Sequence, residues 1–362
     1  MKVNKLLIIG GHPTPALAVI DELRRKYSQI QIDFVGRRFV NNHERNDSFE
    51  YKEIQDRSIQ FIPFTSGRGV LGIVQLPFTI LKAIKILHKL KSDAILSFGG
   101  YISVPICIAG YLLHIPYFLH EQTAIPGYAN IRLSAFARRI MVSFPQTIKY
   151  FDSSKTIVTG NPLRRTLFEA VSKTKTAKIR KPVIFVNGGN LGSHSINIHI
   201  FNILNELLEK YTVIHQVGNI QEYGDWDKAQ DIRINLPKKL FTRYIPLQHL
   251  STADMAKAYS ESDMTVSRSG ANTITELIAL RKPAVLIPLP WSARGEQQAH
   301  AKLLASAHAT ITFNQNELSK SLLVCIQKVI DNVQSYTDNY DTLQHIYVPE
   351  ASTRIIQTIL KS

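Results

Sequence analysis

The chain of 362 residues is 44% hydrophobic and 20% charged, which excludes a disordered or fibrous protein and predicts two globular domains. Its two cysteines, Cys107 and Cys325, lie far apart, which argues against a disulfide scaffold and a cysteine metal site. A net charge of +15 favours phosphorylated ligands or anionic lipid. We find no zinc-finger spacing and no long Lys/Arg block, so nucleic acid is the least favoured partner.

The N-terminal segment, residues 1–9, is too short for a signal peptide and leads directly into a glycine turn. No window reaches the roughly 18 apolar residues that a transmembrane helix needs. We therefore expect a cytoplasmic protein.

Short apolar runs alternate with amphipathic stretches along the whole chain. The runs expected to be strands are Leu6–Ile9, Ile32–Val35, Ala94–Ser97, Tyr117–Leu119, Ile140–Val142, Thr156–Val158, Val183–Val186, Thr212–Gln216, Phe241–Ile245, Met264–Ser267 and Ala284–Pro288. The stretches expected to be helices are Pro15–Lys26, Pro77–Leu90, Val104–Leu113, His194–Lys210 and Thr273–Leu280. This alternation is typical of βαβ units and parallel sheets. The pattern restarts after the basic stretch Lys173–Lys181, so we expect two doubly wound α/β domains.

Paired glycines follow three of the expected strands, at Gly10-Gly11, Gly99-Gly100 and Gly188-Gly189. Each turn by itself could be an ordinary strand–helix connection. Doubly wound sheets bind ligands outside the carboxyl ends of their strands, where glycine lets the backbone approach an anion closely. Together, the three turns predict phosphate cradles in both halves of the chain.

A fourth segment, Ser267–Glu276, reads as a strand end, a Ser-Gly turn and the start of a helix. Backbone N–H groups at a helix N-terminus bind phosphate, and Glu276 lies where a carboxylate could hold ribose hydroxyls. This segment favours a nucleotide ligand.

His12 follows the first glycine turn and is the candidate general base, because imidazole can accept a proton near neutral pH. The alternative is a structural histidine. His120 and Glu121 follow another strand, where they could orient a substrate or a base, or simply hold a turn.

Four further features allow two interpretations each. Arg164 could hold a diphosphate or form an interdomain ion pair, and Gln297 and Gln298 could bind sugar hydroxyls or begin a solvated helix. The Asp225-Trp226-Asp227 segment has a metal-binding spacing, but its polar surroundings predict a surface loop. The basic, apolar stretch Leu76–Lys91 could lie on anionic lipid or form a core helix with a lysine face.

Taken together and in order, these segments resemble the MurG family of bacterial cell-wall synthesis. The matching residues are Gly10-Gly11-His12 with Pro15 and Leu17-Ala18-Val19, Phe98–Ser103, His120-Glu121-Gln122, Gly160–Arg164, Arg268–Glu276 and Gln297-Gln298. Family members transfer N-acetylglucosamine from UDP-N-acetylglucosamine to an undecaprenyl-diphosphate-linked muramyl-peptide.

The resemblance implies a GT-B fold, with two Rossmann-like domains and a cleft between them. Residues 1–164, with a returning C-terminal helix within 345–362, would bind the acceptor and meet the anionic inner face of the plasma membrane. Residues 165–344 would bind the UDP-sugar. No metal or other cofactor is implied.

The resemblance also implies a role for individual residues. His12, His120 and Glu121 would be the catalytic residues, with His12 as the base. The expected donor contacts are Arg164, Asn190, Ile245, Ser269, Gly270, Ala271, Asn272, Thr273, Ile274, Thr275, Glu276, Gln297 and Gln298. The expected acceptor contacts are Gly10, Gly11, Gly99, Gly100, Tyr101, Ser103, Thr123 and Asn130.

The chain departs from the family pattern at several of these sites. The first turn is shorter than the usual Gly-Gly-Thr-Gly-Gly-His, Thr123 replaces an Asn, and Asn190-Leu191 replace Ser-Gln. Two other interpretations therefore stay open: a UDP-N-acetylglucosamine 2-epimerase of the same fold, and a sugar-nucleotide-binding protein of cell-wall assembly with little or no turnover.

Overall fold

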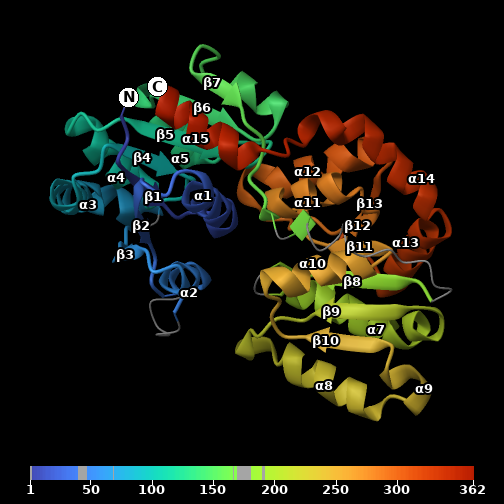
Figure 1. The fold of residues 1–362 in the computed structure, drawn as a ribbon. Coiled ribbons are helices and arrows are strands. Elements are labelled where there is room, and N and C mark those ends of the chain that lie inside the picture. Colours follow the sequence, from blue (N-terminus) through green and yellow to red (C-terminus); the bar gives the residue numbers. More distant parts are fainter. Residues whose placement is uncertain (1, 40–46, 68, 166, 169–180, 190–191) are drawn as a thin grey trace. The chain divides into compact units, whose positions relative to one another are not determined.

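The computed structural model describes residues 2–39, 47–67, 69–165, 167–168, 181–189 and 192–362, with the backbone alone at positions 70 and 71. The chain divides into two compact units (Figure 1). Unit 1 comprises Met1–Arg164 and Val348–Ser362, and unit 2 comprises Arg165–Tyr347. Each unit is an α/β domain built on its own sheet.

Unit 1 is built on a seven-stranded sheet of order β3-β2-β1-β4-β5-β6-β7, whose neighbouring strands pair in parallel. The strands are β1 (Lys5–Ile9), β2 (Gln31–Gly36), β3 (Gln60–Pro63), β4 (Ala94–Ser97), β5 (Tyr117–Glu121), β6 (Arg139–Val142) and β7 (Thr156–Val158). The main helices are α1 (Pro13–Lys26), α2 (Phe49–Asp56), α3 (Gly69–Leu90), α4 (Ser103–Leu112), α5 (Tyr128–Leu133) and α15 (Ala351–Lys361).

Unit 2 repeats this plan with a six-stranded parallel sheet of order β10-β9-β8-β11-β12-β13. Its strands are β8 (Val183–Asn187), β9 (Thr212–Gln216), β10 (Tyr244–Leu247), β11 (Met264–Ser267), β12 (Ala284–Leu286) and β13 (Thr310–Thr312). Its main helices are α7 (His194–Lys210), α8 (Asp225–Asn235), α9 (Lys238–Phe241), α10 (Thr252–Glu261), α11 (Ala271–Leu280), α12 (Glu296–Ser306), α13 (Ser319–Asp331) and α14 (Val333–Asp338).

The central strands are short apolar runs because helices cover both faces of each sheet. Every residue of β8 is buried, and so are the last four of β1. The strand order reverses between β1 and β4 in unit 1 and between β8 and β11 in unit 2. Ligands of such sheets bind at these reversal points, and all the predicted glycine and Ser-Gly turns follow one of these four strands.

Several predicted elements were wrong in their limits. The stretch Phe241–Ile245 is not one strand, because Phe241 is the last residue of helix α9 and the edge strand β10 starts only at Tyr244. Helix α3 begins at Gly69 rather than at Pro77. The prediction of a surface loop at Asp225-Trp226-Asp227 was also wrong, since Asp225 begins helix α8 and is buried.

The C-terminal helix α15 contributes apolar side chains to the core of unit 1. Ile355, Ile356 and Ile359 are buried in one cluster with residues of α1, β1 and β4. At the edge of this contact, Lys26 and Glu22 of α1 form hydrogen bonds with the hydroxyl of Thr353. Unit 1 is therefore completed by a segment far away in the sequence.

Replacing Ile355 with alanine should destabilise unit 1 by about 2–5 kcal/mol, the usual loss for a buried aliphatic side chain. Denaturant unfolding of the purified protein measures this change. Gln357→Ala is the matched control, because Gln357 is exposed on the same helix. Equal effects of the two substitutions would contradict the packing of α15 into this core.

Candidate active site

The first two glycine turns touch each other at the reversal point of unit 1. A Cβ atom at Gly11 would lie 2.1 Å from the carbonyl oxygen of Gly99, so no larger residue fits there. Gly99 and Gly100 both have positive φ, of 80° and 81°. The Ser103 hydroxyl donates to the Gly99 carbonyl at 2.5 Å, and the Gly99 N–H donates to Ser97 Oγ at 3.1 Å. The turns are thus held rigidly without filling the space beside their backbones.

His12 lies at the N-terminus of α1, directly after the first turn. Its side chain keeps solvent access, as a base that meets a substrate requires. The protein packed around the ring lowers its pKa, while the nearby Glu121 carboxylate raises it. The larger effect keeps the imidazole neutral at neutral pH, which is the form that accepts a proton.

Glu121, at the end of β5, holds the loop that follows it. Its buried carboxylate accepts hydrogen bonds from the Thr123 N–H (3.0 Å), the Thr123 hydroxyl (2.7 Å), the Gly127 N–H (3.0 Å) and Asn130 Nδ2 (2.9 Å). Asn130 also lies next to Gly99, so it connects this loop to the second glycine turn. Of the two interpretations left open for Glu121, these contacts favour the one that holds the turn.

His120 is fully buried and joins β5 to the turn after β7. Its Nε2–H donates to the Gly160 carbonyl at 3.0 Å, so Nδ1 is the unprotonated nitrogen that faces the Gln122 amide. Burial lowers the pKa of His120 to about 4, which agrees with this neutral form. Gly160 has a positive φ of 80° and begins the segment that ends at Arg164. His120 therefore fixes the backbone that carries Arg164 rather than facing a substrate itself.

Two arginines of unit 1 lie over aromatic rings near its reversal point. The Arg37 guanidinium lies 5.7 Å from the ring centre of Tyr101, and that of Arg164 lies 5.6 Å from the ring centre of Phe49. Such stacking restricts the side chain and keeps the charge, which suits an anion-binding group. The prediction from sequence included Arg164 and Tyr101 but missed Arg37.

Glu50 on helix α2 was also missed. Its buried carboxylate lies against both Gly10 and Gly36, and it accepts the Arg37 backbone N–H at 2.6 Å. Burial raises the pKa of this carboxyl. Ser48, two residues earlier, could have indicated the start of this helix, because serine is a common helix cap and its side chain accepts the Tyr51 N–H.

In unit 2, the Ser-Gly turn ends β11 and begins α11 as predicted. Gly270 caps the helix without a side-chain bond, and a Cβ atom there would meet no heavy atom within 4 Å. The N-terminus of α11 is therefore approachable by a ligand. Ser269 is buried and donates to the Gln297 carbonyl at 2.8 Å, while Glu276 accepts the Tyr259 hydroxyl at 2.9 Å.

Arg268, next to this turn, holds the start of α7. Its Nη2 donates to Ser193 Oγ at 2.9 Å and to Ser195 Oγ at 2.5 Å. Its Nη1 donates to the Ile287 carbonyl at 3.0 Å and to Gln315 Oε1 at 2.9 Å. Burial lowers its pKa to about 10, so the group is still cationic at neutral pH.

Gln297 and Gln298 hold the loop between β12 and α12. Gln297 Oε1 accepts the Leu289 N–H at 3.0 Å, and Gln298 Nε2 donates to the carbonyls of Leu289 and Pro290, each at 3.1 Å. The loop presents Trp291, whose side chain is 73% exposed and which the sequence interpretation did not consider.

The remaining predicted donor residues are only partly brought together. Helix α11 carries Ala271, Asn272, Thr273, Ile274, Thr275 and Glu276, of which Ile274 and Thr275 are buried. Ile245 lies on the edge strand β10, three strands from β11 and so about 14 Å away at the usual strand spacing. Asn190 lies outside the described residues. Among those described, no group of three or more His, Cys, Asp or Glu side chains could hold a metal ion.

Comparison with known proteins identifies the family. The glycosyltransferase family 28 N-terminal domain matches residues 9–142, and the C-terminal domain of the same family matches residues 183–352. The UDP-N-acetylglucosamine--N-acetylmuramyl-(pentapeptide) pyrophosphoryl-undecaprenol N-acetylglucosamine transferase of Clostridium botulinum is 31% identical over 360 residues, covering 93% of this chain and 94% of its own. This chain belongs to glycosyltransferase family 28 and to the MurG family.

Two further similarities agree with that assignment. The transferase of the same name from Acinetobacter baumannii is 30% identical over 361 residues, covering 97% of this chain and 94% of its own. The crystal structure of Acinetobacter baumannii MurG covers 100% of both chains with a TM-score of 0.75 at 26% identity. The predicted GT-B fold class and the prediction of a glycosyltransferase are confirmed.

A UDP-GlcNAc 2-epimerase from Neisseria meningitidis, solved with UDP-GlcNAc bound, shares the fold alone. It has a TM-score of 0.66 at 15% identity and covers 99% of this chain and 100% of its own. The epimerase interpretation therefore gains no support beyond the architecture.

The buried neutral His120 predicts an acid-sensitive fold. Its folded pKa of about 4 lies below the ordinary 6.5, so between these values the unfolded chain binds a proton that the folded chain does not. Stability therefore falls as the pH drops from about 6.5 to about 4. In a folded His120→Gln variant, the free energy of unfolding should depend less steeply on pH, by up to about 1.4 kcal/mol per pH unit. Denaturant unfolding of both proteins at pH 7 and pH 5 measures the difference, and identical slopes would contradict it.

Proposed function

We propose that this protein transfers N-acetylglucosamine from UDP-N-acetylglucosamine to the 4-hydroxyl of an undecaprenyl-diphosphate-linked muramyl-pentapeptide in peptidoglycan synthesis. The relatives named for this transfer align with nearly the whole chain. The observation that carries the proposal is the placement of His12 on a glycine turn at the reversal point of unit 1, within a chain that matches the family across both units.

The proposed donor site is the carboxyl edge of the unit 2 sheet. The N-terminus of α11, which begins after Gly270, would direct its N–H groups toward the nucleotide phosphates, and Glu276 would hold the ribose. Gln297 and Gln298 hold the neighbouring loop and would lie near the sugar. As the family resemblance implies, Arg164 would supply a cation for the diphosphate.

The proposed acceptor site is the pair of glycine turns in unit 1. The acceptor diphosphate would lie on the backbones of Gly10-Gly11 and Gly99-Gly100, with Arg37 as a further cation. Tyr101 and the loop held by Glu121 border these turns. This arrangement would bring an acceptor hydroxyl to His12.

In the proposed reaction, His12 removes the proton from the 4-hydroxyl as that oxygen attacks the anomeric carbon from the face opposite UDP. The bond to the diphosphate breaks with its electron pair, so UDP leaves and the anomeric centre is inverted. The leaving charge is stabilised by the α11 N-terminus and by Arg164, which is the preorganised electrostatic stabilisation common to such sites. The proposed chemistry uses no metal.

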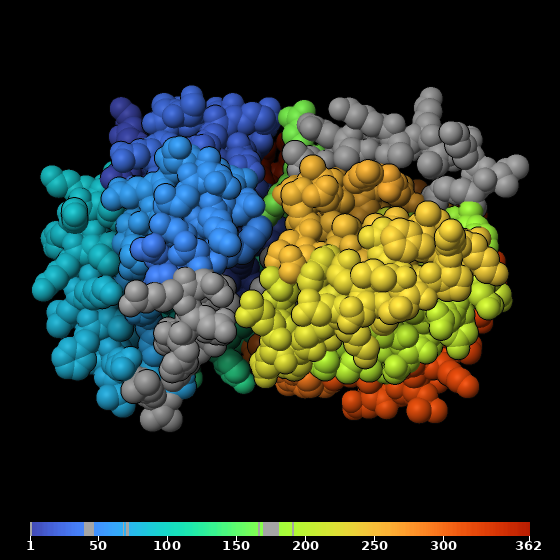
Figure 2. Space-filling view, turned by 90° about the horizontal axis from the view of Figure 1, so that it is seen from below, coloured from blue at the N-terminus to red at the C-terminus, as the bar shows by residue number. Residues whose placement is uncertain are grey.

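Peripheral attachment to the cytoplasmic side of the plasma membrane is part of the proposal. No helix among the described residues is long and apolar enough to cross a membrane. Helix α3 lies on the surface of unit 1 (Figure 2), where Ile73, Val74, Phe78 and Leu81 are 59–74% exposed. Lys82, Lys85 and Lys89 follow on the same helix and are exposed too. An exposed apolar patch beside lysines suits an anionic bilayer surface.

Replacing His12 with alanine should lower turnover by roughly a hundredfold or more, the usual contribution of a general base. Donor affinity should hardly change, because His12 belongs to the acceptor side. The measurement is UDP release from UDP-N-acetylglucosamine with and without a lipid-linked muramyl-peptide, together with calorimetric binding of UDP.

Three outcomes would count against the proposal. Conversion of the donor alone to its C2 epimer would indicate the epimerase. UDP binding without release, across several acceptors, would indicate a binding protein. An unchanged rate in His12→Ala would remove the assigned base.

Replacing Phe78 with serine should weaken binding to phosphatidylglycerol vesicles by about tenfold, because a large apolar side chain contributes roughly 1.5–3 kcal/mol when fully buried. Sedimentation with vesicles measures the bound fraction. Leu318→Ser is the matched control, since Leu318 is 78% exposed but belongs to unit 2. Equal binding of Phe78→Ser and wild type would remove α3 as the membrane contact.

A further inference from the structure

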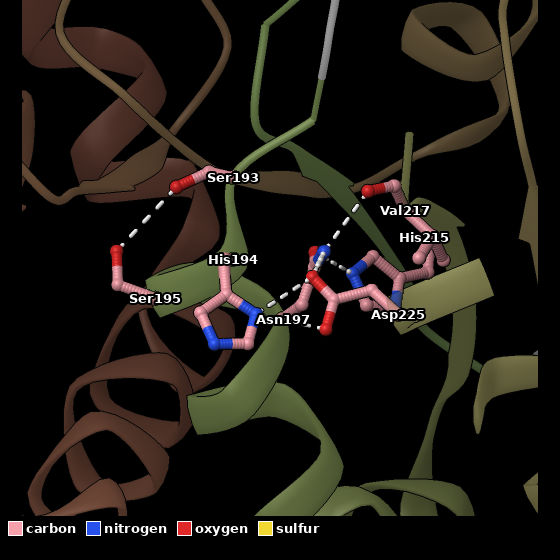
Figure 3. A network of polar contacts seen from close by, with 7 residues as sticks. All are labelled: Ser193, His194, Ser195, Asn197, His215, Val217 and Asp225. Carbon is pink, nitrogen blue, oxygen red and sulfur yellow. Dashed lines mark hydrogen bonds and ion pairs between the residues drawn. The ribbon is translucent and has the colours of Figure 1, made fainter. Parts of the chain in front are cut away.

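A buried chain of polar side chains runs beneath the carboxyl edge of the unit 2 sheet (Figure 3). His215, the fourth of the five residues of β9, is fully buried, and burial lowers its pKa to about 3. Its ring is therefore neutral. His215 Nε2 lies 3.0 Å from Asn197 Oδ1, and Nδ1 lies 3.1 Å from the Tyr244 hydroxyl. Since the amide oxygen can only accept, Nε2 carries the hydrogen and the Tyr244 hydroxyl donates to Nδ1.

Asn197 connects His215 to Asp225. Its Nδ2 donates to the Val217 carbonyl at 2.9 Å and to Asp225 Oδ2 at 2.7 Å. Asp225 also accepts from His194 Nδ1, which lies 2.9 Å from Oδ1. The His194 ring is stacked on that of Tyr223, with 4.1 Å between their centres. The donors around the carboxylate thus come from α7, and the carboxylate itself begins α8.

This series of hydrogen bonds ends at the third glycine turn. His194 is the first residue of α7 and follows Gly192, whose φ is 81°. A Cβ atom at Gly192 would lie 2.1 Å from the Val217 carbonyl oxygen, the same oxygen that Asn197 holds. On the other side, Arg268 holds Ser193. Gly192 and Ser193 are therefore held between Val217, which follows β9, and Arg268, which follows β11.

We propose that Asp225 is a positioning residue for the donor: through His194 and Asn197 it sets the position of Gly192 and Ser193, where the third glycine turn would contact the UDP diphosphate. The inference rests on the proposed function for the identity of the ligand. It assigns a task to the acidic segment that sequence patterns place in a surface loop. The Asp225 oxygens accept hydrogen bonds from His194 and Asn197.

The effect of Asp225 depends on its negative charge, because the groups around its carboxylate are hydrogen-bond donors. Hydrogen bonds to an ionised acceptor are roughly twice as strong as neutral ones, and both partners of Asp225 are donors. An asparagine at this position would place an amide N–H against one of those donors. The start of α7 would then lose one of its two anchors, and the turn would no longer be preorganised for the phosphates.

The test compares Asp225→Asn with Asp227→Asn, which removes an exposed carboxylate from the first turn of the same helix. For Asp225→Asn we expect a roughly tenfold weaker calorimetric Kd for UDP and a similar rise in the KM for UDP-N-acetylglucosamine. The acceptor KM should stay unchanged and kcat should fall less than threefold. Asp227→Asn should match the wild type in every parameter.

Tyr244→Phe extends the test to the far end of the chain, because it removes one hydroxyl and keeps the ring. It should weaken UDP binding about threefold, and it decides the matter if Asp225→Asn does not fold. A folded Asp225→Asn with wild-type UDP affinity would overturn the inference. So would equal rises in both KM values, which indicate a general structural role. If the wild type binds UDP but transfers nothing, the proposed function fails while the UDP affinities still test this inference.

Discussion

The contact between Gly11 and the Gly99 carbonyl is the constraint on which the site of unit 1 depends. Two strand ends meet so closely that neither turn tolerates a side chain, and the backbone itself becomes the surface that a ligand meets. Everything nearby serves to keep that surface in place. The Ser103 hydroxyl fixes the Gly99 carbonyl, and Asn130 connects the same turn to Glu121.

Each unit holds a segment next to its glycine turns with one ionic side chain, and the two side chains have opposite charges. In unit 1, the carboxylate of Glu121 gathers N–H and O–H donors from the loop after β5. In unit 2, the guanidinium of Arg268 donates to the hydroxyls of Ser193 and Ser195 at the start of α7 and to the carbonyl of Ile287, the residue after β12. In both cases an ion is saturated by hydrogen bonds, so its charge persists while its donors or acceptors are no longer offered to a ligand.

The sequence predicted the central strands and the glycine turns that follow some of them, because central parallel strands are short, mainly apolar runs. It missed the edge strands β3 and β13. Glu50 and Asp225 could not be placed in this way. Each lies in the first turn of a polar helix, and the burial of its carboxylate depends on partners distant in sequence. These partners are Arg37 and two glycines for Glu50, and His194 and Asn197 for Asp225. Hydropathy patterns contain no information about such partners. The same limit applies to His120, whose neighbour Gly160 lies 40 residues further along the chain.

The Glu121 carboxylate also acts on His12 through its charge, although its hydrogen bonds are made to other residues. The carboxylate raises the pKa of His12 against the larger, lowering effect of the surrounding protein. In the proposed reaction the imidazole becomes a cation when it takes the acceptor proton. A fixed anion nearby stabilises that cation more than it stabilises the neutral ring, so it favours the product side of the proton transfer. Because four hydrogen bonds already hold the carboxylate, it cannot turn toward His12 and take the proton itself. Glu121 can therefore hold its loop and support the base electrostatically at the same time, and neither task requires it to touch the substrate.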